Sequence, residues 1–174
     1  FVENTTSMLL FATVVLTILF FFGMPYIIQV LAPGFTDNKE AYELAVHFGK
    51  IIFPYIIFIS LAAHFTSINN VHERFAAGAF APAILNISFI LSLFFLTPFV
   101  TTAGHALSYG VLIGGVLQFL YLYRAVLNFY RPRIRIPVLN EKLKKFFKLF
   151  LPGVVGSGVI LSLIHISEPT RPID

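Results

Sequence analysis

Long apolar runs separated by short polar segments make up most of this chain. The runs occupy residues 8–31, 51–68, 80–100 and 106–127. The first run contains no charged side chain, and about 20 consecutive apolar residues are enough for a helix to cross the hydrocarbon core of a bilayer. The pattern therefore predicts an all-α fold, a polytopic membrane helical bundle with four complete spanning helices and a truncated fifth over residues 146–161.

The polar segments predict how the first two spans begin and end. Residues 4–7 offer Asn, Thr and Ser side chains as N-caps for a helix that starts near Met8. The Pro-Gly pair at 33–34 stops that helix, and a net acidic loop over 36–43 follows outside the bilayer. Apolar residues at helical spacing predict a short amphipathic helix over 41–47, which rests on the membrane interface before the second span.

The second and third spans are predicted to form a helical hairpin over residues 53–86. Pro54 interrupts its first arm, and because proline has no backbone N–H we expect a helix kink there. The connecting turn carries Asn70 and Arg74. Charged groups are costly in hydrocarbon, so we expect this turn in water, with the Arg74 side chain capping carbonyl groups at the end of the second span.

Small and polar residues inside the spans are the candidates for packing and binding. Gly110 and Gly114 have the spacing that lets two helix backbones approach closely, which predicts a helix-packing seam. Ser60 and Asn86 are the candidates for substrate contact, and a hydrogen bond between helices is the alternative for Asn86. His64 lies on the same polar face as Ser60, and we interpret it as a neutral, hydrogen-bonded histidine rather than a proton relay.

Basic residues gather on one side of this alternating topology. Arg74 and the basic cluster from Arg124 to Lys148 share that side, whereas Lys39 and Lys50 are the lysines of the opposite side. The positive-inside rule then makes the turn with Asn70 and Arg74 cytoplasmic. The cluster indicates topology and contact with membrane lipids. Recruitment of a pyrophosphate headgroup is the alternative, and no nucleic-acid partner is expected.

Composition excludes several classes of function. Hydrophobic residues form 57% of the chain and charged residues 11%, which is more apolar than a soluble domain. The absence of cysteine removes disulfides, thiol nucleophiles and cysteine metal sites. His47, His72 and His105 are expected in separate loops without ligand spacing, so we predict no metal site. Without a phosphate-binding loop or a catalytic triad, neither an enzyme nor a cofactor is indicated.

Five segments taken together resemble one protein family. They are FPYIIFISLAA from Phe53, the spacing from Asn70 to Arg74-Phe75, FAPAILN from Phe80, LAPGF from Leu31 and GGVLQ from Gly114. Their order and spacing are similar to those of the lipid II flippase family, also called the MurJ or MviN family, of the multidrug/oligosaccharidyl-lipid/polysaccharide exporter superfamily. The resemblance covers residues 8–159 and corresponds to the third to seventh membrane helices of that family.

The resemblance implies a transport role in peptidoglycan biosynthesis, and through it in cell-wall supply and cell shape. A member of the family would move the lipid-linked peptidoglycan precursor, lipid II, across the bacterial cytoplasmic (inner) membrane by alternating access. Residues 1–160 would be a multi-pass fragment of the N-terminal half of the flippase, completed by the remaining helices of the full-length protein. The arginines that would hold the pyrophosphate lie on helices outside this chain. The alternatives are a flippase for another lipid-linked oligosaccharide, a drug exporter and a non-transporting scaffold.

Both ends of the chain differ from its spans. Phe1 stands where a native start would have Met, and no charged segment precedes the first apolar run, so we expect neither a signal peptide nor a native start. The string LSLIHISEPTR from Leu161 resembles the translation of a sequencing adapter. Residues 161–174 are therefore expected to be a non-native tail, and a genuine polar tail is the alternative.

Overall fold

The structure is a computed structural model that describes residues 2–32, 34, 38–132 and 148. The chain divides into two compact units, one of residues 2–136 and the other of residue 1 with residues 137–174. Apart from Lys148, every described residue belongs to the first unit. The truncated fifth span and the adapter-like tail therefore fall outside the described residues, again except for Lys148.

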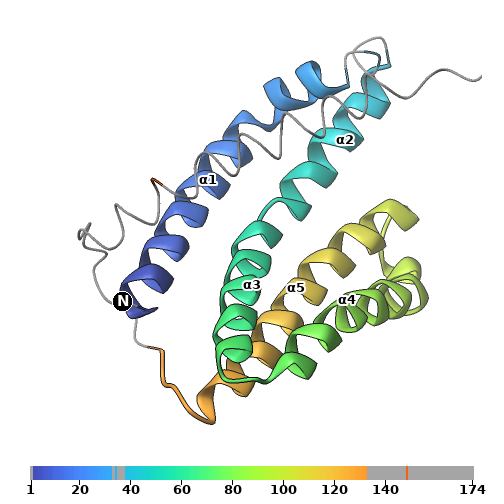
Figure 1. The fold of residues 1–174 in the computed structure, drawn as a ribbon. Helices are drawn as coiled ribbons and strands as arrows, with labels where there is room; N and C mark the ends of the chain where they lie inside the picture. Colours follow the sequence, from blue (N-terminus) through green and yellow to red (C-terminus); the bar gives the residue numbers. More distant parts are fainter. Residues whose placement is uncertain (1, 33, 35–37, 133–147, 149–174) are drawn as a thin grey trace, which may run out of the picture. The chain divides into compact units, whose positions relative to one another are not determined.

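The described part of the first unit contains helices joined by short turns and no strand, which confirms the all-α class (Figure 1). Its elements are α1 (Val2–Leu31), α2 (Lys39–Ile52), α3 (Tyr55–Val71), α4 (Phe75–Leu96), the 3-10 helix η2 (Thr97–Phe99) and α5 (Ala103–Leu127). Four stretches are long and apolar enough to cross a membrane, namely α1, α2 with α3, α4 with η2, and α5. The four predicted complete spans are thus confirmed.

Helix α1 begins at Val2 rather than near Met8, so the predicted N-caps are wrong. The Thr6 hydroxyl donates to the Val2 carbonyl at 2.8 Å, and the Ser7 hydroxyl donates to the Glu3 carbonyl at 2.9 Å. Serine and threonine in a helix interior commonly bond back to the carbonyl four residues earlier. These hydroxyls therefore belong to the first turns of α1 and leave no cap at Met8.

The second span consists of two helices that meet at Phe53-Pro54. The interface helix expected over 41–47 is instead the 14-residue helix α2, which packs against α1 and α5. Pro54 cannot donate to the carbonyl four residues earlier. The N–H groups of Ile56 and Ile57 accordingly turn to carbonyls three residues earlier, at 3.0 and 3.2 Å. The break therefore lies where proline removes the helical hydrogen bond.

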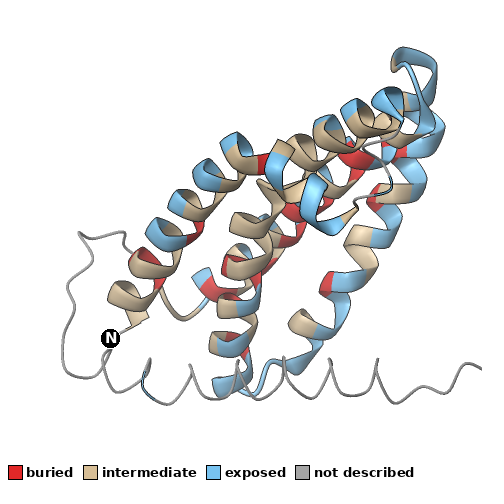
Figure 2. Ribbon diagram, turned by 90° about the horizontal axis from the view of Figure 1, so that it is seen from above, coloured by how far each residue is buried: buried red, intermediate tan, exposed pale blue. Residues whose placement is uncertain are grey.

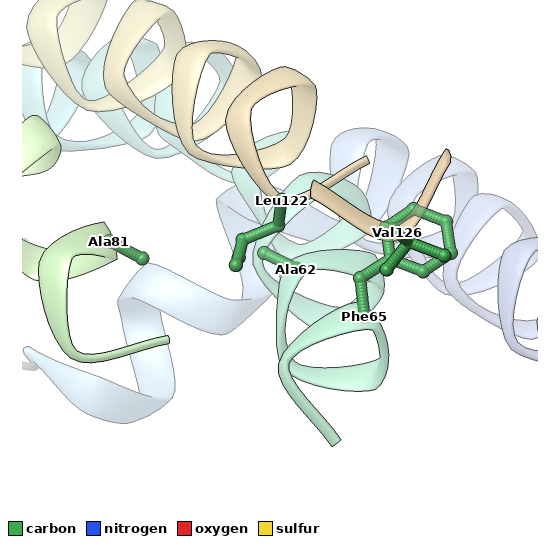
Figure 3. Packing of buried hydrophobic residues seen from close by; sticks show 5 residues of the cluster. All are labelled: Ala62, Phe65, Ala81, Leu122 and Val126. Atoms are coloured by element: carbon green, nitrogen blue, oxygen red, sulfur yellow. The ribbon is translucent and has the colours of Figure 1, made fainter. Parts of the chain in front are cut away.

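Helices α3 and α5 are central to the packing, because α5 contacts α2, α3 and α4 and α3 contacts α1, α4 and α5. A buried cluster joins α3, α4 and α5 near one end of α5 (Figure 3). Its members are Ala62, Phe65, Ala81, Leu122 and Val126. The outer faces of the helices stay exposed (Figure 2), with large apolar side chains such as Phe22, Val30 and Phe94 at least three-quarters exposed. Such faces suit lipid or further helices rather than water.

Candidate functional site

The turn between α3 and α4 is closed by its own backbone. The Asn69 carbonyl accepts the N–H groups of His72 at 3.0 Å and Arg74 at 2.9 Å, and the Asn70 carbonyl accepts that of Glu73 at 3.0 Å. Glu73 has a φ of 59°, in the left-handed region that lets a chain leave a helix. The carbonyls that end α3 are thus satisfied by backbone N–H groups, including that of Arg74.

The Arg74 side chain has a different partner from the one we expected. Its guanidinium lies over the Phe129 ring at 5.3 Å, and the His72 ring lies 4.1 Å from the same ring. Phe129 follows the C-terminus of α5. The turn is therefore fastened to the end of α5 through an aromatic contact, while the side chains of Asn70 and Arg74 remain exposed.

Small residues line the contact between α4 and α5, where the structure places Gly110 and Gly114. Both glycines are buried. A Cβ atom added to Gly110 would lie 2.9 Å from the Ser92 Cβ, and one added to Gly114 would lie 3.1 Å from the Ser88 Cβ. Ser88 and Ser92 are themselves buried, with exposed fractions of 4% and 3%. Neither glycine could carry a side chain without moving its neighbours.

Gln118 is the polar link between helices that sequence reasoning missed. Its Nε2 donates to the Ala81 carbonyl of α4 at 2.8 Å, and its side chain is only 3% exposed. Asn86, which we considered for this task, is exposed on α4, and Ser60 is half-buried on α3. Neither the Asn86 nor the Ser60 side chain makes a hydrogen bond within the described region. The structure does not bring these two candidates together.

His64 of α3 is hydrogen-bonded, as the sequence predicted, and its partner lies on α1. Its Nε2 lies 2.9 Å from the Thr6 Oγ1. Thr6 also lines a cavity of about 330 Å³ between α1, α3 and α5, whose other walls are mainly apolar and include Leu10, Leu61 and Phe119. This arrangement ties α1 to α3 and leaves room for an apolar group.

The expectation that His47 and His105 lie apart in loops is wrong. His47 is on α2 and His105 is in the first turn of α5, and the centroids of their rings are 5.2 Å apart. The helical packing of α2 against α5 brings them together, which no spacing in the sequence indicates. The described residues contain no group of three or more histidine, cysteine, aspartate or glutamate side chains suited to a metal ion.

Four long apolar helical stretches, exposed apolar outer faces and polar links buried between helices define a multi-pass helical membrane protein. Comparison with known proteins identifies the family. The family model described as lipid II flippase MurJ matches residues 1–165. This chain therefore belongs to the lipid II flippase MurJ family.

Individual relatives give the same result. The lipid II flippase MurJ of Burkholderia cenocepacia is 36% identical over 119 residues, which cover 68% of this chain and 23% of that protein. The probable lipid II flippases MurJ of Rhizobium tropici and Rhizobium meliloti are 33% and 34% identical, and each match covers 91% of this chain and 31% of the relative. The chain thus spans between about a quarter and a third of the length of these relatives.

The family match is wider than the resemblance that the motifs showed. It begins at residue 1, whereas the motifs pointed to a start at residue 8, and it ends at residue 165. It therefore includes residues 161–165 of the segment that resembles an adapter. Residues 166–174 lie outside the match.

Proposed function

We propose that this chain is part of a flippase that moves lipid II from the inner to the outer leaflet of the bacterial cytoplasmic membrane. The observation that carries the proposal is the family match over residues 1–165, together with four helical stretches that can span a bilayer. The names of the relatives favour lipid II over another lipid-linked oligosaccharide or a drug. They equally favour a transporter over an enzyme or a scaffold.

The chemistry of the substrate explains why such a protein is needed. Lipid II carries a pyrophosphate and a disaccharide-pentapeptide, and groups of this charge and polarity cannot cross hydrocarbon unaided. Alternating access of two helical bundles around a central site solves the problem. In this account the described helices form part of one bundle, and the exposed apolar faces contact membrane lipids or the remaining helices of the full-length protein.

Two features support a scaffold role for these helices within the flippase. The amide nitrogen of the buried Gln118 and the ring of the half-buried His64 are each hydrogen-bonded to a neighbouring helix. The exposed guanidinium of Arg74 lies in the turn against Phe129 rather than inside a span. Asn86 is the described candidate for contact with substrate or with a remaining helix, because its amide is exposed within an apolar span.

Complementation tests the proposal. A bacterial strain depleted of its own lipid II flippase should regain growth and cell shape when the full-length protein containing this chain is expressed. The inactive control is the same protein, at an equal amount in the membrane, in which the arginines expected to hold the pyrophosphate, on helices outside this chain, are replaced. Failure of the intact protein to restore growth, despite correct insertion, would refute the proposed function.

A further inference from the structure

Two histidines from different helices face each other at the end of the bundle opposite the Arg74 turn. His47 lies on α2 and His105 in the first turn of α5. Their ring centroids are 5.2 Å apart, and the planes are inclined by 53°. His47 is exposed and His105 is half-buried, so both rings can be reached from solvent.

The ring of His105 is held by its neighbours. Its Nδ1 lies 2.9 Å from the Thr102 Oγ1, and Thr102 is also the N-cap of α5. The Phe48 ring packs edge-on against the imidazole with centroids 4.9 Å apart. When the Thr102 hydroxyl accepts this bond from Nδ1, Nε2 of His105 is unprotonated and can bind a metal, and such an oriented ring is usual around metal-binding histidines.

The distance between the two rings fits a shared metal ion. Zinc binds imidazole nitrogen at about 2.0–2.1 Å, so a tetrahedral ion holds two imidazole centroids roughly 5 Å apart. The observed separation of 5.2 Å agrees with this geometry. The His47 ring makes no hydrogen bond within the described region, so either of its nitrogens can bind an ion. The separation of the rings therefore permits both histidines to bind one ion.

We propose that His47 and His105 form a two-histidine site for a divalent transition-metal ion, with Zn²⁺ as the representative. Water would complete the coordination, because the described residues supply no third ligand at the pair. Glu43, one helical turn before His47, instead lies 3.9 Å from the Lys39 ammonium. An ion bound here would clamp α2 to α5, just beyond the break that separates α2 from α3.

The site is tested with zinc on the full-length protein in detergent. Competition with a chromophoric zinc chelator should show binding that His47→Ala and His105→Ala each weaken at least tenfold. Glu43→Ala and His72→Ala are matched controls, since His72 lies at the opposite end against Phe129. Both controls should bind zinc within twofold of the unchanged protein.

Two further measurements separate loss of a ligand from loss of folding. Zinc should raise the melting temperature of the unchanged protein, because an ion that binds the folded state stabilises it, and this increase should vanish in both histidine variants. The pair His47→Cys with His105→Cys should restore zinc binding through thiolate ligands. Zinc affinity and melting behaviour that do not change in the His47→Ala and His105→Ala variants would overturn the proposal.

Discussion

The close approach of α4 and α5 depends on the absence of a Cβ atom at the glycines of α5. At Gly110 the space that a Cβ would need is already filled by Ser92, whose Cβ would lie 2.9 Å and whose Oγ would lie 2.8 Å away. Lipid gives helices no hydrophobic reason to associate, so close packing and polar links between helices must supply the attraction. The Gln118–Ala81 bond, at 2.8 Å, is such a link in the same helix pair.

Gly110→Ala should therefore destabilise the full-length protein. Overpacking of a tight contact costs about 1–3 kcal/mol, so the melting temperature in detergent should fall. Gly23→Ala is the matched control, because a Cβ there would meet only the Ile27 Cδ1 at 3.8 Å. Equal melting temperatures for the two variants would contradict the close packing of α4 on α5.

Arg74→Ala should leave transport largely intact. The guanidinium contributes a contact over Phe129, and an exposed cation–π contact is worth about 0.5–1 kcal/mol. Phe129→Ala should cost more stability, because it also removes the ring that His72 contacts. The measurements are complementation of a flippase-depleted strain and the amount of inserted protein. Normal insertion of Arg74→Ala with complete loss of transport would place the turn in the mechanism.

The residue types in the spans could predict where two helices pack closely, but not which polar side chains form hydrogen bonds between helices. The four-residue spacing of Gly110 and Gly114 is visible in the sequence because both lie on one helical face. Gln118 was missed because its acceptor is 37 residues away and belongs to another helix. Asn86 was considered for the same task, yet it lies on the exposed side of α4. The direction of a polar side chain in a span is set by the packing of neighbouring helices.

At the scale of elements, the apolar runs predicted the number of spans but not where the helices begin. An apolar run ends at the first charged or polar residues. A helix, in contrast, continues through such residues as long as its backbone N–H and C=O groups can form helical hydrogen bonds. The polar residues Glu3 to Ser7 are therefore helical, and α2 extends to Ile52. Proline is the exception to this continuation, because it has no backbone N–H to donate to the helix. Pro54 accordingly marks the break between α2 and α3.

Pro54→Ala should join α2 and α3 into one continuous helix. Alanine supplies the missing N–H and has the highest helix propensity. Hydrogen–deuterium exchange of the full-length protein should then become slower over residues 53–57. Ala83→Ser, a small change in the middle of α4, should leave exchange in this segment unaltered. Unchanged exchange in the Pro54→Ala variant would show that the surrounding helices, rather than proline, impose the break.

At the scale of the whole molecule, the arrangement of helix ends supports the predicted topology. The contact of Arg74 with Phe129 brings the α3–α4 turn to the C-terminal end of α5. The contact of His47 with His105 brings α2 to the N-terminal end of α5. Basic residues gather at the first of these ends: Arg74 lies in the turn, Arg124 in the last turn of α5 and Arg131 beyond its C-terminus. This distribution agrees with the positive-inside rule.

Single cysteines at positions 74 and 131 should be labelled from the same side of the membrane. This chain contains no cysteine, so each introduced thiol reports one position once any cysteine in the rest of the full-length protein has been replaced. A membrane-impermeant maleimide added to intact cells should label a cysteine at position 39 but neither of the other two. Labelling of 74 and 131 from opposite sides would contradict the topology.

The proposed function is tested most directly by the amount of lipid II that reaches the outer leaflet. In cells depleted of their own flippase, an impermeant enzyme that cleaves lipid II should find little substrate from outside. Expression of the full-length protein containing this chain should restore cleavage to the level before depletion, because the headgroup cannot cross unaided. An accessible fraction that stays low, although the protein is inserted in normal amounts, would contradict a role as a lipid II flippase.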